Sequence, residues 1–362
     1  MKFQSPMLAK NRELNELLDI TIEEQASDLH LSVGQPPILR IAGELVPLSK
    51  KAPLGREILE AYVFALLTDA QKVRLQEQKE LDFSYTLEDR ARFRGNAFYA
   101  LGSLSLALRL IPHEIRGVEQ LNLPSILHQF SRANQGFVIV AGPSGHGKST
   151  TLAALIDEIN HTRGEHIITI EDPIEYLFSD DKSIVDQREV TKDTHSFANA
   201  LRATFRQDPD VIMVGEMRDP ETIGTALTAA ETGHLVFATL HTNSAAQSVH
   251  RIVDSFPAEQ QGQVRAQLSG SLLGVISQRL LPRLQGGLVP ACEVMLANSA
   301  VSNLIRENKV HELPLVIETS AEDGMISLNR SLATLVKVRE ITLDSALKHS
   351  LNPNELRSLI HG

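Results

Sequence analysis

Cysteine is almost absent from this sequence, since Cys292 is the only one among 362 residues. A single cysteine excludes an internal disulfide and a zinc site built from cysteines, and it fits a reducing compartment. Long apolar runs are also missing, because none approaches the roughly 20 residues that a helix needs to cross a membrane. Residues 1–10 lack the apolar core of a signal peptide. We therefore expect a cytoplasmic protein without direct membrane insertion, which reaches a membrane only through its partners.

The sequence also lacks an excess of basic residues. Lys and Arg number 35 against 45 Asp and Glu, which gives a formal net charge of -10. This balance argues against a broad nucleic-acid surface, and no cluster combines aromatic with basic residues. We expect no nucleic-acid partner. The hydrophobic share of 42% and the charged share of 22% are ordinary for a globular protein, and the length allows about two or three domains.

The first part of the chain mixes helical and strand-like patterns. Apolar spacing predicts helices over 11–26 and 56–78, a hairpin at 88–90, and strands over 27–31, 38–41, 82–87, 91–99 and 103–110. Strands joined by short turns favour an antiparallel sheet, so we interpret residues 1–112 as a small α+β domain. A polar stretch with Pro112 and Gly117 predicts a linker over 113–120, and a helix over 121–132 follows it.

From Phe137 the pattern changes to apolar strands that alternate with helical segments. The strands are predicted over 137–141, 166–170, 211–214 and 235–240. This alternation indicates an α/β domain with a mostly parallel sheet, over residues 121–362 and with a helical region at its C-terminal end. Polar residues follow each strand. Because open parallel sheets bind ligands at the carboxyl ends of their strands, we expect a single site there.

A glycine-rich loop follows the first of these strands and precedes a helix predicted over 150–160. Residues 142–149 fit G-x-x-x-x-G-K-[ST], in which backbone N–H groups surround a phosphate at a helix N-terminus. Lys148 is expected to reach the β- and γ-phosphates and Ser149 to ligate Mg²⁺, so the cofactors are ATP and Mg²⁺. The predicted phosphate-binding residues are Gly142, Pro143, Ser144, Gly145, His146, Gly147, Lys148, Ser149 and Thr150. Of these, His146 occupies a free position in the pattern, and a loop that binds nucleotide without hydrolysing it has the same pattern.

Two acidic residues follow strands that should end beside this loop. Glu216 comes after the strand over 211–214, as an acid that holds Mg²⁺ or polarises the attacking water should. Glu171 follows the strand over 166–170 and is the second candidate. We expect Mg²⁺ to be held by Ser149, Glu171 and Glu216, partly through water. The alternative for either acid is an ion pair with a surface base at a strand end.

Histidines and arginines form the remaining candidates. His234 and His241 flank the strand over 235–240, where they could sense the γ-phosphate by hydrogen bonding or have a structural role. Arg92 and Arg94 share one face of a strand, and Arg109 lies on the next strand. These three arginines could act in trans on a phosphate, or they could simply form a solvated strand face.

The motifs together resemble those of the secretion-type hexameric ATPases, and most closely those of the PilT-like motors that retract type IV pili. Five stretches match the family's N-terminal signature, Walker A box, Asp box, Walker B box and His box in order: 26–31, 142–150, 170–175, 208–219 and 232–242. The resemblance implies a PAS-like N-terminal domain and a RecA-like P-loop C-terminal domain. It also implies a homohexameric ring that hydrolyses ATP.

Specific roles follow from the resemblance. Glu216 would be the catalytic glutamate, with Glu171 supporting Mg²⁺ and water. His234 and His241 would be the box histidines, and Arg92, Arg94 and Arg109 match N-terminal arginines that reach phosphates. The implied work is pilus retraction at the inner face of the bacterial inner membrane, on a platform protein, with a PilT-like paralogue as a further partner.

Neighbouring functions stay open. Residues 300–307 resemble the retraction motors' AIRNLIRE motif, with Val301 in place of Ile and Ser302 in place of Arg, and an accessory paralogue would look much the same. Pilus assembly and type II secretion ATPases usually have a longer N-terminal region and a four-cysteine zinc motif, and this sequence has neither. A ring subunit that binds ATP without hydrolysing it is disfavoured by the intact Lys148 and Glu216.

Overall fold

The computed structural model describes residues 6–41, 43–88, 90–111 and 114–361, and for 6–11 it describes the backbone only. The chain divides into two compact units, Met1–Glu114 and Ile115–Gly362. Parts of three predictions lie outside the described residues: the start of the N-terminal segment (1–5), Asp89 in the predicted hairpin, and 112–113 at the start of the predicted linker.

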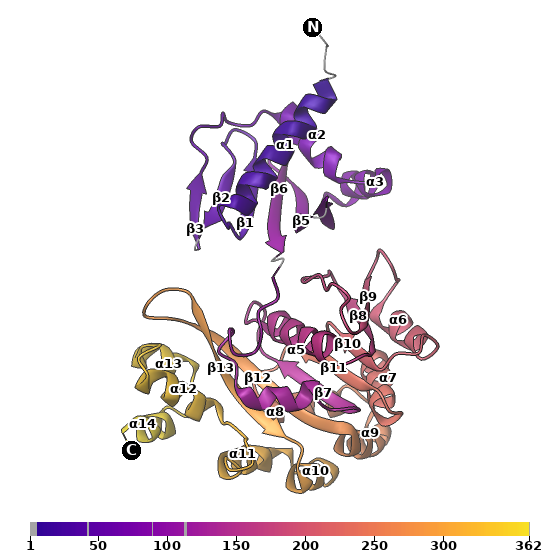
Figure 1. The fold of residues 1–362 in the computed structure, drawn as a ribbon, viewed down its shortest axis with the longest axis vertical. Helices are drawn as coiled ribbons and strands as arrows, with labels where there is room; N and C mark the ends of the chain where they lie inside the picture. Colours follow the sequence, from indigo (N-terminus) through magenta and orange to yellow (C-terminus); the bar gives the residue numbers. More distant parts are fainter. Residues whose placement is uncertain (1–5, 42, 89, 112–113, 362) are drawn as a thin grey trace. The chain divides into compact units, whose positions relative to one another are not determined.

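The first unit is a six-stranded antiparallel sheet packed against helices (Figure 1). Its elements are α1 Pro6–Glu23, β1 Asp28–Ser32, β2 Ile38–Ile41, β3 Glu44–Pro47, α2 Arg56–Leu66, α3 Asp69–Gln78, β4 Glu80–Leu87, β5 Ala91–Ala100 and β6 Ser103–Ile111. The strand order is β3-β2-β1-β6-β5-β4. Leu18, Leu59 and Phe93 are fully buried where the helices meet the sheet, and burial of each such side chain stabilises the unit by about 1.5–3 kcal/mol.

The helix predicted over 56–78 is wrong in one respect, because the structure has two helices there. Leu67 adopts an extended backbone after α2, and Thr68 begins α3 as its N-cap. The Thr68 hydroxyl accepts from the Gln71 amide, and the Gln71 side chain accepts from the Thr68 amide. This reciprocal pair satisfies two donors at a helix start, so it allows a new helix to begin where apolar spacing alone indicated continuity.

The second unit confirms the predicted mostly parallel sheet. Its strands are β7 Gly136–Ala141, β8 His166–Glu171, β9 Ile184–Glu189, β10 Val211–Val214, β11 Leu235–Leu240, β12 Leu272–Pro282 and β13 Leu288–Leu296. They pair in the order β13-β12-β7-β11-β10-β8-β9, and all neighbours are parallel except the β12–β13 hairpin. The carboxyl ends of β7, β10 and β11 therefore lie side by side at one edge.

Helices cover both faces of this sheet. They are η1 Ser125–Leu127, α4 His128–Ser131, α5 Lys148–Thr162, α6 Phe197–Thr204, α7 Pro220–Glu231, α8 Ala245–Asp254, α9 Ala258–Ser271, α10 Ser299–Arg306, η2 Val310–Glu312, α11 Leu313–Thr319, α12 Leu328–Lys337, α13 Leu343–His349 and α14 Pro353–His361. Phe137 and Ile139 face the core under α6–α11, whereas Val138 and Val140 face α4 and α5. The last three helices group beside the β12–β13 hairpin (Figure 1).

The segment that joins the two units differs from its prediction. From Ile115 onward the described part of the predicted linker belongs to the second unit, and Val118 is buried in the core beside Leu127. The helix predicted over 121–132 is reduced to a 3₁₀ turn and the four-residue α4. Pro124 explains the late start, since proline cannot donate the hydrogen bond that a helix interior requires.

This segment is tied to α5 by a histidine between two carboxylates. The His128 ring lies 2.5 Å from Glu119 through Nε2 and 2.8 Å from Glu158 through Nδ1. Hydrogen bonds to Glu119 and then Glu158 raise the pKa of His128 above the ordinary histidine value. A charged His128 therefore links the start of the second unit to α5, the helix that begins at Lys148.

We expect His128→Gln to lower the free energy of unfolding by about 1 kcal/mol at pH 5.5 and by less at pH 9. Because the folded pKa is raised, the stabilisation is fully present below about pH 6.5 and is lost as the pH rises through the folded value. Urea unfolding at the two pH values measures the difference. His250→Gln, at an exposed site paired with Asp254, is the matched control. An equal loss of unfolding free energy at both pH values would contradict a stabilising charge on His128.

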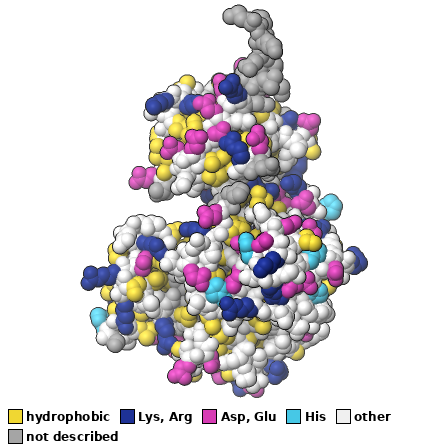
Figure 2. All heavy atoms as spheres, in the orientation of Figure 1, with side chains coloured by type: hydrophobic (Ala, Val, Ile, Leu, Met, Phe, Trp, Pro, Cys, Tyr) yellow, Lys and Arg dark blue, Asp and Glu magenta, His cyan; other side chains and the backbone are white. Residues whose placement is uncertain are grey.

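No helix within the described ranges is long and apolar enough to cross a membrane. The face shown in Figure 2 mixes acidic and basic side chains, with hydrophobic side chains in small groups.

Candidate nucleotide site

The glycine-rich loop lies between β7 and α5 with its glycines in conformations that other residues rarely adopt. Gly142, Gly145 and Gly147 have φ angles of 149°, 77° and 80°. A Cβ atom at Gly142 would lie 2.6 Å from the carbonyl oxygen of Gln278, so a side chain there would displace β12. The loop therefore needs glycine both for its curvature and for its close approach to the neighbouring strand.

Lys148 opens α5 and is buried beneath this loop. Its Nζ donates to the carbonyl oxygens of Gly142 at 2.9 Å and Pro143 at 3.0 Å. Burial lowers the pKa of Lys148, while the charges of Glu216 and Glu175 act in the opposite direction. The ammonium group is thus held inside the curve of the loop and close to two carboxylates. Ser149 follows it in the first turn of α5, and the Thr150 hydroxyl pairs with the Tyr176 hydroxyl at 2.8 Å.

Glu216 lies beyond the end of β10 and beside the end of β11. Its Oε1 is 2.7 Å from Arg218 Nε and 3.1 Å from His241 Nε2. The His241 Nδ1 in turn lies 3.3 Å from the Ser144 hydroxyl in the loop. Partial burial acts to raise the pKa of Glu216, but Arg218, His241 and Lys148 outweigh it and hold the pKa below the ordinary value. An ionised carboxylate is therefore linked through His241 to the phosphate-binding loop.

Glu171 ends β8 in a different environment. The Thr169 hydroxyl donates to its Oε1 at 2.7 Å, Gln187 Nε2 donates to the same oxygen at 3.1 Å, and the Glu175 amide donates to Oε2 at 3.4 Å. Burial raises the pKa of Glu171 to about 7 despite these donors. Because both carboxylate oxygens are engaged by the protein, the geometry favours a supporting role over direct metal coordination.

His234 is not brought to this site, which corrects the expectation that both histidines lie near the γ-phosphate. It precedes β11, whose six residues span about 20 Å. Leu240 at the other end pairs with Ala141 beside the loop, whereas Leu235 pairs with Gly136. The His234 ring lies 2.9 Å from the Ala229 carbonyl through Nδ1 and packs edge-on against Phe205. It therefore joins α7 to the amino end of the sheet.

The three predicted arginines belong to the first unit and share one face of its sheet. Arg94 pairs directly with Arg109 across β5 and β6. The Arg109 Nε donates to Asp28 Oδ1 at 2.9 Å, although its side chain remains 67% exposed. Arg92 is buried and donates to the Ser84 hydroxyl at 3.2 Å. The sheet thus concentrates positive charge, with Asp28 as a buried counter-charge.

A cavity of about 510 Å³ adjoins the start of α5. It is lined by Arg116, Gln120, Leu121, Asn122, Leu123, Gly147, Thr150, Thr151, Gln278, Leu280, Arg283, Gly286, Gly287, Leu288 and Pro290. Apolar side chains together with amide and guanidinium groups suit a heterocycle and a sugar next to phosphates. None of the lining residues beyond the loop and α5 was predicted, because 116–123 and the β12–β13 hairpin reach the loop only in the folded chain.

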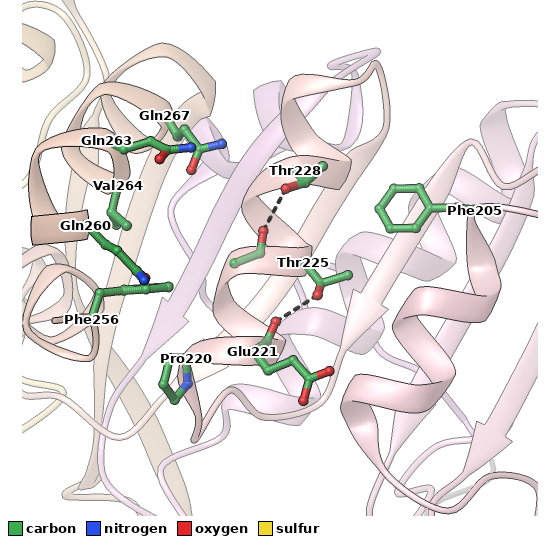
Figure 3. A pocket seen from close by; sticks show the side chains of 11 residues that line it. Phe205, Pro220, Glu221, Thr225, Thr228, Phe256, Gln260, Gln263, Val264 and Gln267 are labelled. Carbon is green, nitrogen blue, oxygen red and sulfur yellow. Dashed lines mark hydrogen bonds between the residues drawn. The ribbon is translucent and has the colours of Figure 1, made fainter.

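A second cavity, of about 420 Å³, lies between α7 and α9 near Phe205 (Figure 3). The hydroxyls of Thr225 and Thr228 donate to carbonyls of their own helix, as the dashed lines show. Glu221 is the one charged side chain among the described residues that line it. Without a basic group this cavity does not suit a phosphate, and none of the predicted site residues faces it.

The residues of the glycine-rich loop and of the neighbouring strand end, next to the first cavity, fit a nucleotide and Mg²⁺. The glycine-only cradle and the buried Lys148 suit the phosphates. Mg²⁺ usually keeps water and phosphate ligands and takes one or two ligands from the protein, which the hydroxyl of Ser149 and the carboxylate of Glu216 would supply here. Within the described residues no cluster of three or more His, Cys, Asp and Glu side chains could hold a metal by itself. A metal here would accordingly depend on the nucleotide.

Sequence reasoning missed several residues of this site. Glu175 lies close enough to Lys148 to affect its pKa, and Arg218 pairs with Glu216. Gln278 and Arg279 are buried polar residues within the apolar strand β12. A buried polar pair in an apolar run is unusual, and that pattern was the available signal.

The known proteins that this chain resembles include ATPases. Residues 7–346 match the model of a family described as "Type II/IV secretion system protein". The type IV pilus retraction ATPase PilT of Pseudomonas aeruginosa is 45% identical over 94% of this chain and 99% of its own length. The type IV pilus ATPase PilU of the same organism is 41% identical over 96% and 91%. A crystal structure of the pilus retraction motor PilT with bound ADP is 48% identical, with a TM-score of 0.89 over 95% of this chain and 98% of that one.

Proposed function

We propose that this chain, which belongs to the type II/IV secretion system protein family, is an ATPase that powers retraction of a type IV pilus. The observation that carries the proposal is 45% identity to a pilus retraction ATPase across 94% of the chain. The loop with Lys148, Glu216 and His241 supplies the chemistry that such a motor needs.

In the proposed reaction the residues of the loop and of the strand ends divide the tasks among them, and Glu216 has two of these tasks. Lys148 and the backbone N–H groups of the loop bind and orient the phosphates, and Ser149 and Glu216 hold Mg²⁺. The ion, when bound, neutralises charge on the phosphate oxygens. Glu216 accepts a proton from the attacking water, because its pKa is held low and it stays ionised. His241 links Glu216 to Ser144, so it can sense whether the loop is filled.

The proposed motor is a homohexamer that works at the inner face of the bacterial inner membrane. Its partner there is a platform protein of the pilus. Arg92, Arg94 and Arg109 are proposed to contribute positive charge to phosphates in the assembled ring, where Arg109 is the most available because its side chain is largely exposed.

An accessory paralogue is the second candidate. The specific observation in its favour is the change from the retraction motif at Val301 and Ser302, together with 41% identity to PilU over 96% of the chain. Val301 is fully buried in α10, so its exchange for Ile changes packing, whereas Ser302 lies near the surface. Ser302 therefore removes a positive charge from a helix that is otherwise similar.

Glu171 leads to a pH prediction for the proposed ATPase. We expect the turnover number to rise as the pH increases through about 7, because Glu171 is ionised only above that value. Glu171→Gln should lose this step and lower turnover by about tenfold to a hundredfold, as the loss of a group that supports metal and water does. Steady-state hydrolysis between pH 6 and 9 measures it, with exposed Glu231→Gln as the control. An unchanged pH profile in Glu171→Gln would assign the step to another group.

The proposed function is tested by hydrolysis and retraction together. The purified protein should hydrolyse ATP as a hexamer by mass measurement. The gene, placed in a piliated bacterium that lacks its own retraction ATPases, should restore retraction of labelled pili, whereas a Glu216→Gln gene should not. Retraction restored only when a paralogue is supplied would identify the accessory subunit. Retraction driven by the Glu216→Gln protein would refute the proposal that ATP hydrolysis by this chain drives retraction.

A further inference from the structure

The glycine-rich loop is attached to β12 by two side chains that the motif does not specify, Gln278 of β12 and His146 at a free position of the loop. Gln278, which is 1% exposed, donates through Nε2 to the His146 carbonyl at 2.6 Å. Its Oε1 accepts from the Thr151 hydroxyl in α5 at 2.7 Å. Gln278 therefore contacts both the loop and the first turns of the helix that follows it.

His146 makes the second attachment. Its Nδ1 lies 3.0 Å from the backbone N–H of Leu280 in β12. Because a backbone N–H can only donate, Nδ1 is the accepting nitrogen and the ring is neutral, with its proton on Nε2. Protonation at Nδ1 would oppose two donors and break this hydrogen bond.

Electrostatics support the neutral form. The charged and titratable groups that act on the ring are Arg279 of β12, His349 of α13 and Lys148 of α5. All three carry or can carry positive charge, and together with burial they lower the pKa of His146. Burial is the largest of these causes. The attachment is thus fully present above about pH 6.5 and is lost only as the pH falls through the lowered pKa of His146.

We propose that His146 and Gln278 are positioning residues that hold the phosphate-binding loop against β12 in the conformation that receives nucleotide. The inference rests on the proposed nucleotide hydrolysis and adds residues that shape the loop without touching the reacting atoms. The tight approach at Gly142 and Gly147 supports it, since a Cβ there would meet Gln278 at 2.6 and 3.0 Å. Gln278 therefore limits the path of the loop at both ends, through its backbone carbonyl at Gly142 and through its side chain at Gly147.

Nucleotide affinity, measured without turnover, tests this inference. The dissociation constant of Mg·ADP is determined by calorimetry at pH 8.0 for the full-length protein and its variants. His146→Leu removes the acceptor and leaves the Leu280 N–H unpaired, so affinity should fall about tenfold at pH 8.0. His146→Asn places a non-titrating acceptor near the Nδ1 position. It should therefore rescue the loss in His146→Leu and bind within about twofold of wild type at pH 8.0.

Gln278→Glu is the second variant, because it keeps the acceptor for Thr151 and turns the donor toward His146 into an acceptor. It should weaken affinity by a similar factor. Thermal unfolding of each variant without nucleotide shows whether a loss of affinity comes from loss of the fold. The control variant is His311→Asn, which makes the same exchange at an exposed histidine. Wild-type affinity in both His146→Leu and Gln278→Glu would overturn the inference. Absence of binding by the wild-type protein would instead overturn the proposed ATPase.

Discussion

Replacement of Glu216 by Gln is expected to lower the turnover number for ATP by about 10²- to 10⁴-fold while nucleotide still binds. Gln has nearly the same shape and can still accept a hydrogen bond from Arg218, so the loop and β10 should keep their positions. It cannot accept a proton from water at neutral pH, which is the task that the low pKa of Glu216 permits. Single-turnover hydrolysis and Mg·ADP calorimetry separate the two effects.

The matched control for this prediction is Glu221→Gln. Glu221 is exposed at the start of α7 and pairs with Arg202, away from the loop. Its exchange should leave turnover within about twofold of wild type, as surface substitutions do. Substantial turnover in Glu216→Gln would transfer the role of proton acceptor to another carboxylate. Glu175, the other carboxylate that acts on the pKa of Lys148, is then the next candidate.

Replacement of Lys148 by Ala should weaken nucleotide binding by about a hundredfold or more. Hydrogen bonds from a charged group contribute about 1.5–3 kcal/mol each, and 2.7 kcal/mol corresponds to roughly a hundredfold in affinity. The buried ammonium donates to two loop carbonyls, so its loss also leaves the oxygens of Gly142 and Pro143 without that partner. We therefore expect the loop to lose both its positive charge and part of its shape.

Calorimetry with Mg·ADP measures the loss, and Lys192→Ala, at an exposed site between β9 and α6, is the control. Lys148→Arg keeps the charge but presents a planar group on a longer side chain, so it should rescue affinity only in part. Binding by Lys148→Ala within threefold of wild type would show that the loop is not the phosphate site.

Much of the architecture was accessible from local patterns. Apolar strands over four to six residues and the glycine loop between β7 and α5 were visible in the sequence, because each is specified by neighbouring residues. The rule that parallel strands bring their carboxyl ends together then placed Glu216 and His241 at the same edge as the loop, where the structure has them 3.1 Å apart.

The predictions failed where the outcome depends on the direction of a strand or on pairing between segments far apart in the chain. His234 and His241 are equivalent in a one-dimensional view of the strand between them, yet β11 separates them by its whole length. The β12–β13 hairpin forms one edge of the sheet, and β12 pairs with β7 although the two strands are far apart in the sequence. No local pattern predicted this pairing of β12 with β7. Thr68 and Pro124 shortened helices through capping and a missing donor, which apolar spacing does not record.

The sequence by itself determined the family, the phosphate-binding loop and the strands that carry the acidic and histidine candidates, since these are encoded in contiguous residues. Only the tertiary structure decided that Gln278 and Leu280 hold His146, across more than 130 positions of the chain. Only it decided that Glu171 titrates near 7, while Glu216 stays ionised. The physical reason is that desolvation and hydrogen bonding sum over all atoms that surround a group, and in this site those atoms come from segments distant in sequence.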